Sequence, residues 1–257
     1  MLWPMAIRRT ALAALLAVGL STAARAESVD LALVLAADVS RSIDGEEFSL
    51  QREGYAQAMT DPRVLRAIRS GVAGAIAVCF VEWASPEEQQ VVSDWKVIRD
   101  GETAEVFAAK LNDAPRSFLG RTSISGAIDF AMAKLASSGF EAKRRIIDIS
   151  GDGTSNSGGP LDQARARALK AGIVINGLAI INERPNPGAL AHTQPPGGLP
   201  AYYRDNVIGG EGSFLLVVRD FDSFGEAIRN KILTEIAGTP PPGALAATVT
   251  APTRTSP

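Results

Sequence analysis

The chain has 257 residues, of which 46% are hydrophobic and 21% are charged. This length and apolar content suit one domain with a sizeable core. With 26 basic and 28 acidic residues the formal net charge is −2 at pH 7. Nucleic acids and anionic membrane surfaces attract basic proteins, so this balance argues against both as partners.

Residues 1–26 have the pattern of a cleavable signal peptide. Arg8 and Arg9 give a basic start, residues 11–20 are an apolar run, and residues 24–26 read Ala-Arg-Ala, a small-x-small cleavage pattern. The apolar run is too short to cross a bilayer. We therefore predict cleavage after Ala26 and a periplasmic or secreted protein without a stable membrane anchor. The mature chain would keep 23 basic and 28 acidic residues, a net charge of −5.

Apolar runs alternate with amphipathic segments along the mature chain. Strands are expected at residues 31–37, 73–81, 145–149, 173–180 and 214–218, with a more mixed edge strand at 91–98. Strands this apolar are typical of sheets covered on both faces. Helices are expected at residues 46–59, 124–135, 160–169 and 221–232. The alternation predicts a doubly wound α/β fold with a mostly parallel central sheet and helices on both faces.

Two segments do not fit this alternation. Residues 182–200 contain five prolines, which predicts a Pro/Gly-rich surface insertion without regular structure. Residues 238–257 are rich in Pro, Ala and Thr and predict a disordered tail. The α/β domain is thus expected to span residues 27–237.

The chain contains too few histidines and cysteines for the common nucleophilic enzymes. His192 is the single histidine and lies in the proline-rich insertion, where a solvent-exposed loop residue is expected. Cys79 is the single cysteine, which precludes an intrachain disulfide, and its apolar neighbours predict a buried, inert thiol. Ser-His-Asp and Cys-His catalysis are therefore not expected.

Two predicted strands end in an acid close to small oxygen-bearing residues. The first reads Asp38-Val-Ser40-Arg-Ser42, and the second reads Ser-Gly-Asp152-Gly-Thr. In an open α/β sheet, ligands bind beyond the carboxyl ends of the strands. The alternate spacing of Asp-x-Ser-x-Ser lets three oxygen atoms converge from one loop. Carboxylates and hydroxyls are hard donors that suit Mg²⁺, and also Mn²⁺ or Ca²⁺.

The charge of this set indicates what a bound ion would do. Two carboxylates neutralise a dication, while hydroxyls fill other positions without adding charge. The ion would then still attract one more anionic oxygen, and Mg²⁺ keeps exchangeable waters readily. The residues therefore point to adhesion through a metal ion to an acidic group of a partner.

At these residues the chain resembles a known family. Residues 30–43, Asp-Leu-Ala-Leu-Val-Leu-Ala-Ala-Asp-Val-Ser-Arg-Ser-Ile, are similar to the opening of a von Willebrand factor type A (VWA) domain. In that family Asp-x-Ser-x-Ser, a later Thr and a later Asp form the metal-ion-dependent adhesion site (MIDAS). The resemblance, which covers residues 29–237, implies the metal ligands Asp38, Ser40, Ser42, Thr122 and Asp152. Residues 147–156 and 173–180 resemble more closely the bacterial DUF1194 subgroup, whose function is unknown.

The resemblance implies a non-enzymatic binding module, which the predicted signal peptide would export. Its ion, preferably Mg²⁺, would bind an Asp or Glu carboxylate of a protein partner. One alternative is a Mg²⁺-dependent phosphoryl-transfer hydrolase of doubly wound fold, similar to the haloacid dehalogenase group. Ser40 stands where such an enzyme has its second Asp. The other alternative is a structural domain with a vestigial metal site.

Residues near these motifs are expected to have structural or surface roles. Asp148, deeper in its strand, is expected to be a buried acid with a structural partner beneath the site. Arg41 is expected on the solvated rim, and Asn156 is expected to satisfy the turn after the strand. For Tyr202 and Tyr203, a contact surface and core packing are both open.

Overall fold

The computed structural model describes residues 26–181, 195–219, 224–238 and 247–249. In these residues one sheet contains β1 (Glu27–Asp38), β2 (Ile76–Trp83), β3 (Gln89–Ile98), β4 (Phe140–Gly151), β5 (Val174–Ile180), β6 (Leu215–Val218) and β7 (Ala247–Val249). The strand order is β3-β2-β1-β4-β5-β6-β7, and only the β2–β3 pair is antiparallel. The predicted edge strand is thus β3.

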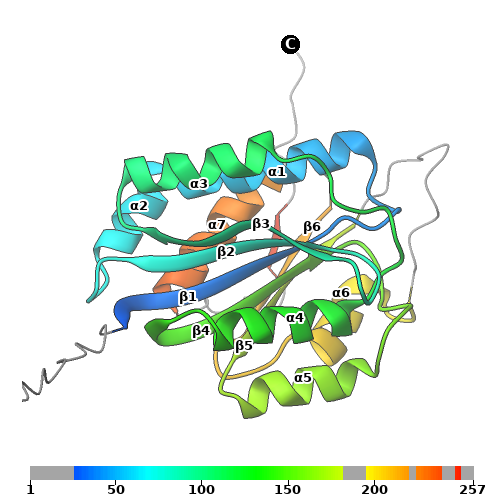
Figure 1. Cartoon of the computed structure of the whole chain (residues 1–257). Coiled ribbons are helices and arrows are strands. Elements are labelled where there is room, and N and C mark those ends of the chain that lie inside the picture. Colours follow the sequence, from blue (N-terminus) through cyan, green and yellow to red (C-terminus); the bar gives the residue numbers. More distant parts are fainter. Residues whose placement is uncertain (1–25, 182–194, 220–223, 239–246, 250–257) are drawn as a thin grey trace, which may run out of the picture.

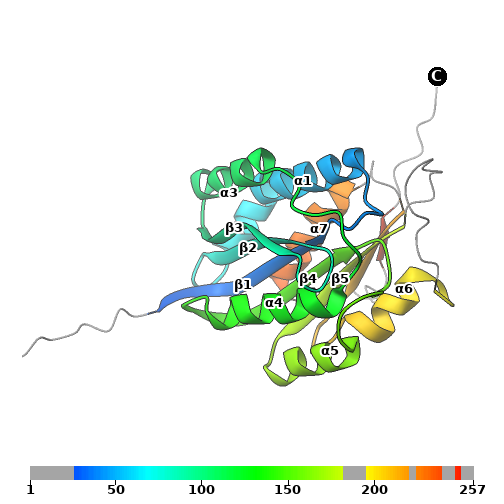
Figure 2. The same cartoon turned by 45° about the vertical axis from the view of Figure 1, so that its right-hand side comes forward.

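Helices cover both faces of this sheet (Figure 1). One face carries α1 (Gly45–Thr60), α2 (Pro62–Arg69), α3 (Gly101–Asp113) and α7 (Phe224–Ala237). The other carries α4 (Ile124–Ala136), α5 (Leu161–Lys170), α6 (Gly198–Tyr202) and the π-helical turn η1 (Tyr203–Val207), which lies against α5 (Figure 2). The predicted doubly wound α/β fold is confirmed. No helix in the described ranges is long and apolar enough to cross a membrane.

The structure corrects two predictions about irregular segments. Residues 247–249 pair with β6, so the disordered tail predicted over 238–257 is wrong for these three residues. β-branched Thr248 and Val249 suit a strand, and without them β6 would be the sheet edge. α6 begins at Gly198, inside the insertion 182–200 for which no regular structure was predicted. Pro200 does not prevent this helix, because it lies in the first turn, where proline is tolerated. Two predicted segments lie outside the described residues: the signal peptide up to residue 25, and residues 182–194 of the insertion, which include His192.

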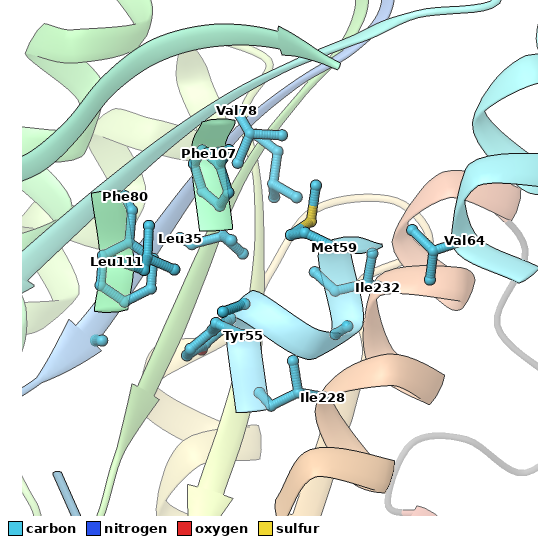
Figure 3. Close-up of a cluster of buried hydrophobic side chains, with 14 of the residues drawn as sticks. Leu35, Tyr55, Met59, Val64, Val78, Phe80, Phe107, Leu111, Ile228 and Ile232 are labelled. Atoms are coloured by element: carbon cyan, nitrogen blue, oxygen red, sulfur yellow. The ribbon is translucent and has the colours of Figure 1, made fainter. Parts of the chain in front are cut away.

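The core consists of two apolar layers, one on each face of the sheet. Successive side chains of β1 alternate between them, as expected for a strand: Leu31, Leu33 and Leu35 face α1, α3 and α7, whereas Ala32, Val34 and Ala36 face α4 and α5. Figure 3 shows Leu35 in the first layer with residues of α1, β2, α3 and α7, among them Tyr55, Phe80, Phe107 and Ile228.

Cys79 of β2 is fully buried in the second layer. Burial raises the pKa of its thiol to about 12. A thiol that stays protonated at neutral pH is a poor nucleophile. The predicted burial of Cys79 is confirmed, and its raised pKa is in line with the inert thiol expected from the sequence.

A buried charge cluster fastens α7 to the centre of the sheet. Lys231 Nζ of α7 lies 2.9 Å from Asp148 Oδ1 of β4 and 2.8 Å from Glu235 Oε1, and all three residues are almost completely buried. Asn176 of β5 donates from Nδ2 to Glu235 Oε2 at 2.7 Å. Asp148 therefore has the structural partner expected for it, and this partner comes from a helix 83 residues farther along the chain.

Asp148 gives stability a pH dependence that can be measured. Burial raises the pKa of its carboxyl to about 7, although the charge of Lys231 pulls it down. An unfolded Asp has a pKa of about 3.9, so the folded state binds a proton at Asp148 more tightly than the unfolded state. The stability gained from this proton is complete below pH ~4 and is lost as the pH rises through ~7. Between pH ~5 and ~8 the unfolding free energy of wild type should fall relative to that of Asp148→Asn, as measured by urea denaturation. A constant difference between the two proteins over that range would contradict this.

Candidate metal centre

The sheet register brings the two predicted acidic segments to the same edge. β1 ends at Asp38 and β4 ends at Gly151, just before Asp152. These strands are parallel neighbours, with Ala37 opposite Ser150, so the residues that follow them meet beyond the carboxyl ends of both strands. Thr122 lies in the loop before α4 and reaches the same place.

All five predicted ligands are linked by hydrogen bonds. Asp38 Oδ1 accepts from the Ser40 backbone N–H at 2.7 Å. The hydroxyls continue the chain: Thr122 Oγ1 lies 3.4 Å from Ser40 Oγ, and Ser40 Oγ lies 3.2 Å from Ser42 Oγ. Ser42 Oγ donates to Asp152 Oδ1 at 2.8 Å. The structure therefore brings the five residues together, and their binding of a metal stays a prediction.

Two buried acids make this cluster strongly favourable to positive charge. Asp38 and Asp152 are almost completely buried. Burial, and then the negative charge of Asp152, raises the pKa of Asp38 well above its ordinary value. Asp38 Oδ2 is buried and accepts no hydrogen bond from the described residues. A buried carboxylate oxygen without a donor costs free energy, which a bound cation would relieve.

The donor set fits a hard divalent cation. It combines two carboxylates with three hydroxyls, the oxygen ligands that suit Mg²⁺ and Mn²⁺. Within the described ranges no group of three or more His, Cys, Asp or Glu side chains is placed to hold a metal ion. The candidate centre thus has the two-carboxylate composition expected from the sequence.

Asn156 has a more specific role than the turn residue expected from the sequence. Its side-chain Oδ1 accepts from the Thr122 backbone N–H at 3.1 Å. Its own backbone N–H donates to the Thr122 carbonyl at 2.9 Å. This two-way contact fixes the loop before α4 against the loop after β4, and so places the Thr122 hydroxyl within reach of Ser40.

Arg116, which sequence reasoning missed, binds the backbone of the loop after β1. Its Nη2 donates to the carbonyls of Val39 and Ser40, both at 2.7 Å, and its Nε donates to the carbonyl of Phe118 at 3.0 Å. The guanidinium also lies over the ring of Phe48, 5.5 Å from its centroid. A planar guanidinium can serve several acceptors at once, which suits it to fixing two consecutive carbonyls.

A buried ion pair supports the loop that carries Arg116. Arg52 Nε of α1 donates to Glu82 Oε1 of β2 at 2.7 Å, and both side chains are buried. Glu82 Oε2 accepts from the Ser117 backbone N–H at 3.0 Å, and Arg52 also donates to the carbonyls of Leu111 and Pro115. The position of the loop after β1 thus depends on contacts that begin in α1 and β2.

Replacing Arg116 with methionine should lower divalent cation affinity on the order of tenfold, because two carbonyls beside the ligands lose a charged donor. Isothermal titration calorimetry with Mn²⁺ would measure the loss. Arg121→Met is the matched control, since it removes the same charge from an exposed side chain beside Thr122. Equal affinities of both variants and wild type would show that Arg116 does not position the loop.

Gly151 allows β4 to pass unusually close to Asp38. A Cβ built on Gly151 would lie 3.0 Å from Asp38 Oδ2 and 2.6 Å from the hydroxyl oxygen of Tyr203 in η1. Real Cβ atoms essentially never approach another heavy atom to 2.6 Å. A side chain at this position would therefore displace the Asp38 carboxylate, the Tyr203 hydroxyl or both.

Gly151→Ala should accordingly weaken cation binding by more than tenfold and lower the melting temperature, because overpacking costs about 1–3 kcal/mol. Gly153→Ala is a close control: the nearest atom to its Cβ would be Thr122 Oγ1 at 3.9 Å, an ordinary contact. Thermal unfolding with Mg²⁺ and with chelator would measure both effects. The prediction fails if the two variants behave alike.

Comparison with known proteins places the chain in a family. The model of the family described as "Protein of unknown function (DUF1194)" matches residues 28–240. The chain belongs to the DUF1194 family. A search of curated proteins found no match.

The fold of this DUF1194 protein is similar to that of solved VWA proteins. Proximal thread matrix protein 1 from the mussel byssus, solved with a zinc-occupied MIDAS motif, superimposes with a TM-score of 0.56 at 14% identity, over 82% of this chain and 46% of that one. A von Willebrand factor type A protein from Catenulispora acidiphila gives 0.55 at 13% identity, over 81% and 43%. The pilus adhesin SpaC from Lactobacillus rhamnosus GG gives 0.56 at 12% identity, over 81% and 31%. The chain spans less than half the length of each, and the superpositions show a shared VWA fold.

Proposed function

We propose that this DUF1194 protein is an exported, metal-dependent binding module. A divalent cation, preferably Mg²⁺, would be held by Asp38, Ser40, Ser42, Thr122 and Asp152. The ion would then bind an Asp or Glu carboxylate of a protein partner. The observation that carries the proposal is the connected cluster of these five residues, in which Asp38 Oδ2 is buried without a donor from the described residues.

The charge around the cluster supports an acidic ligand. Two carboxylates balance one dication, so a third anionic oxygen would complete the coordination without strong repulsion. Arg41 and Arg121 are exposed in the loops that carry Ser40 and Thr122. Positive side chains beside the ion would attract an acidic segment and disfavour a basic one.

Two of the similar folds support the same kind of role. The mussel byssus protein has zinc in its MIDAS motif, and SpaC is a pilus adhesin. For this chain we infer a MIDAS-type ion and a protein partner by analogy with them. Export through a signal peptide over residues 1–26, with cleavage after Ala26, would place the module in the periplasm or outside the cell, where adhesion proteins act.

Affinity capture with the purified protein as bait tests metal and partner together. Exported proteins are applied in Mg²⁺, in chelator, and to an Asp38→Asn bait. We expect partners retained only by wild type in Mg²⁺, and their loss when the carboxylates of the applied fraction are first amidated with a carbodiimide. Capture that survives chelator or amidation would contradict a metal–carboxylate contact.

The same variant distinguishes the two alternative functions. Mg²⁺-dependent turnover of phosphate esters that disappears in Asp38→Asn would favour a phosphoryl-transfer hydrolase. A folded protein that binds neither Mg²⁺ nor Mn²⁺ would favour a structural domain with a vestigial site. Neither result is expected if the cluster is a metal-dependent binding site.

A further inference from the structure

Tyr203 carries an unpartnered hydroxyl directly beside the candidate metal centre. Its side chain is completely buried at the start of η1, and its hydroxyl forms no hydrogen bond with the described residues. The neighbouring Tyr202 differs, because its hydroxyl accepts from the Ser155 backbone N–H at 3.1 Å. A buried hydroxyl without a partner costs free energy, so its retention requires an explanation.

The hydroxyl of Tyr203 and the carboxylate of Asp38 both approach the same point of β4. As described for Gly151, a Cβ at that residue would lie 2.6 Å from the Tyr203 oxygen and 3.0 Å from Asp38 Oδ2. The two oxygens can therefore be no farther apart than the sum of these distances, a separation that one bridging water can span. Within the described residues, the Tyr203 hydroxyl is a buried donor without an acceptor, and Asp38 Oδ2 is a buried acceptor without a donor.

The chemistry of the pair is complementary. The phenol of Tyr203 is protonated at neutral pH, as tyrosine ordinarily is, and can therefore donate a hydrogen bond. Hydrogen bonds from a neutral donor to a carboxylate are among the stronger ones in proteins.

We propose that Tyr203 is a positioning residue of the metal centre: in the metal-bound protein its hydroxyl donates to Asp38 Oδ2, directly or through one water, and so fixes the orientation of this ligand. The inference rests on the proposed function. Under this proposal Tyr203, which follows the proline-rich insertion, has a role in the metal centre. The sequence had suggested only a contact surface or core packing for Tyr202 and Tyr203.

Tyr203→Phe removes only the hydroxyl and tests the proposal by two measurements. Calorimetric titration with Mg²⁺ should give an affinity lower on the order of tenfold, because one hydrogen bond to a charged ligand is lost. The melting temperature in chelator should be equal to or higher than that of wild type, because a buried hydroxyl without a partner disappears. Tyr55→Phe is the control: its hydroxyl is also completely buried, but lies near Asp148 on the α1 side of the sheet.

A spectroscopic signal separates positioning from general packing. The chain has three tyrosines, Tyr55, Tyr202 and Tyr203. Protein labelled with 3-fluorotyrosine should therefore give three ¹⁹F resonances, which the Phe variants assign. Addition of Mg²⁺ should shift the Tyr203 resonance most and the Tyr55 resonance least.

The outcomes separate this inference from the proposed function. If wild type binds Mg²⁺ while Tyr203→Phe binds it equally well, or if the Tyr203 resonance does not move, the positioning role is wrong and the proposed function stands. A loss of affinity accompanied by a loss of stability in chelator would also overturn it, as that indicates a packing role. If wild type binds no Mg²⁺, both fail together.

Discussion

Replacement of Asp38 by asparagine should abolish divalent cation binding without destabilising the metal-free protein. Asparagine keeps the oxygen that accepts from Ser40 N–H, so the loop after β1 can retain its conformation. It removes one of two buried negative charges, and with it the repulsion by Asp152 that helps to raise the pKa of Asp38. A gain of ~1 kcal/mol would raise the melting temperature by about 2–4 °C in a domain of this size.

The sign of the effect should reverse when cation is added. A cation that binds only the folded state stabilises it by about 2.7 kcal/mol at a hundredfold excess over its dissociation constant. Wild type should therefore melt higher in Mg²⁺ and the variant should not respond. Asp129→Asn is the matched control, because Asp129 lies in an exposed pair with Arg167 and its loss makes the same change in charge. A variant that still gains stability from Mg²⁺ would contradict the role of Asp38.

Replacement of Lys231 by methionine should cause the largest loss of stability in the domain, about 3–5 kcal/mol, because breaking a buried ion pair leaves charge uncompensated. Lys231 is the cation between Asp148 and Glu235, and all three are almost completely buried. Urea denaturation followed by circular dichroism measures the loss.

Two further variants show whether charge, and not packing, causes this loss. Lys231→Met combined with Asp148→Asn and Glu235→Gln should recover much of the stability, since neither acid is then left charged. Lys134→Met, which breaks the pair of Lys134 with the exposed Asp94, should cost about 0–1 kcal/mol. Equal losses in the single and triple variants would contradict the electrostatic explanation.

The features that were predictable from the sequence are those with a local pattern. Each apolar strand is a continuous run of apolar residues in the sequence, because both faces of the sheet are covered. The helix α4 has a regular apolar stripe that ends near Gly139. The two acidic motifs stand at strand ends, so the fold class alone predicted that Asp38 and Asp152 would meet. The prediction that Asp148 is a buried structural acid also followed from its place within a strand.

Other features have no such pattern. α3 packs through Ala104, Phe107, Ala108 and Leu111, and two alanines give a weak apolar signal. Arg116 lies in an irregular loop more than 70 residues from the carbonyls that it binds, and Lys231 is polar in the apolar face of α7. Such contacts depend on tertiary packing between distant segments, which one sequence does not reveal. The close approach of Tyr203 to Gly151 is of the same kind.

The most direct test of the central claim is a calorimetric titration of the purified protein with Mn²⁺ and Mg²⁺. If Asp38, Ser40, Ser42, Thr122 and Asp152 form a metal centre, wild type binds one ion per chain, the two ions compete, and Asp38→Asn binds neither. No heat of binding from wild type, together with no shift in its melting temperature on addition of either ion, would contradict the claim.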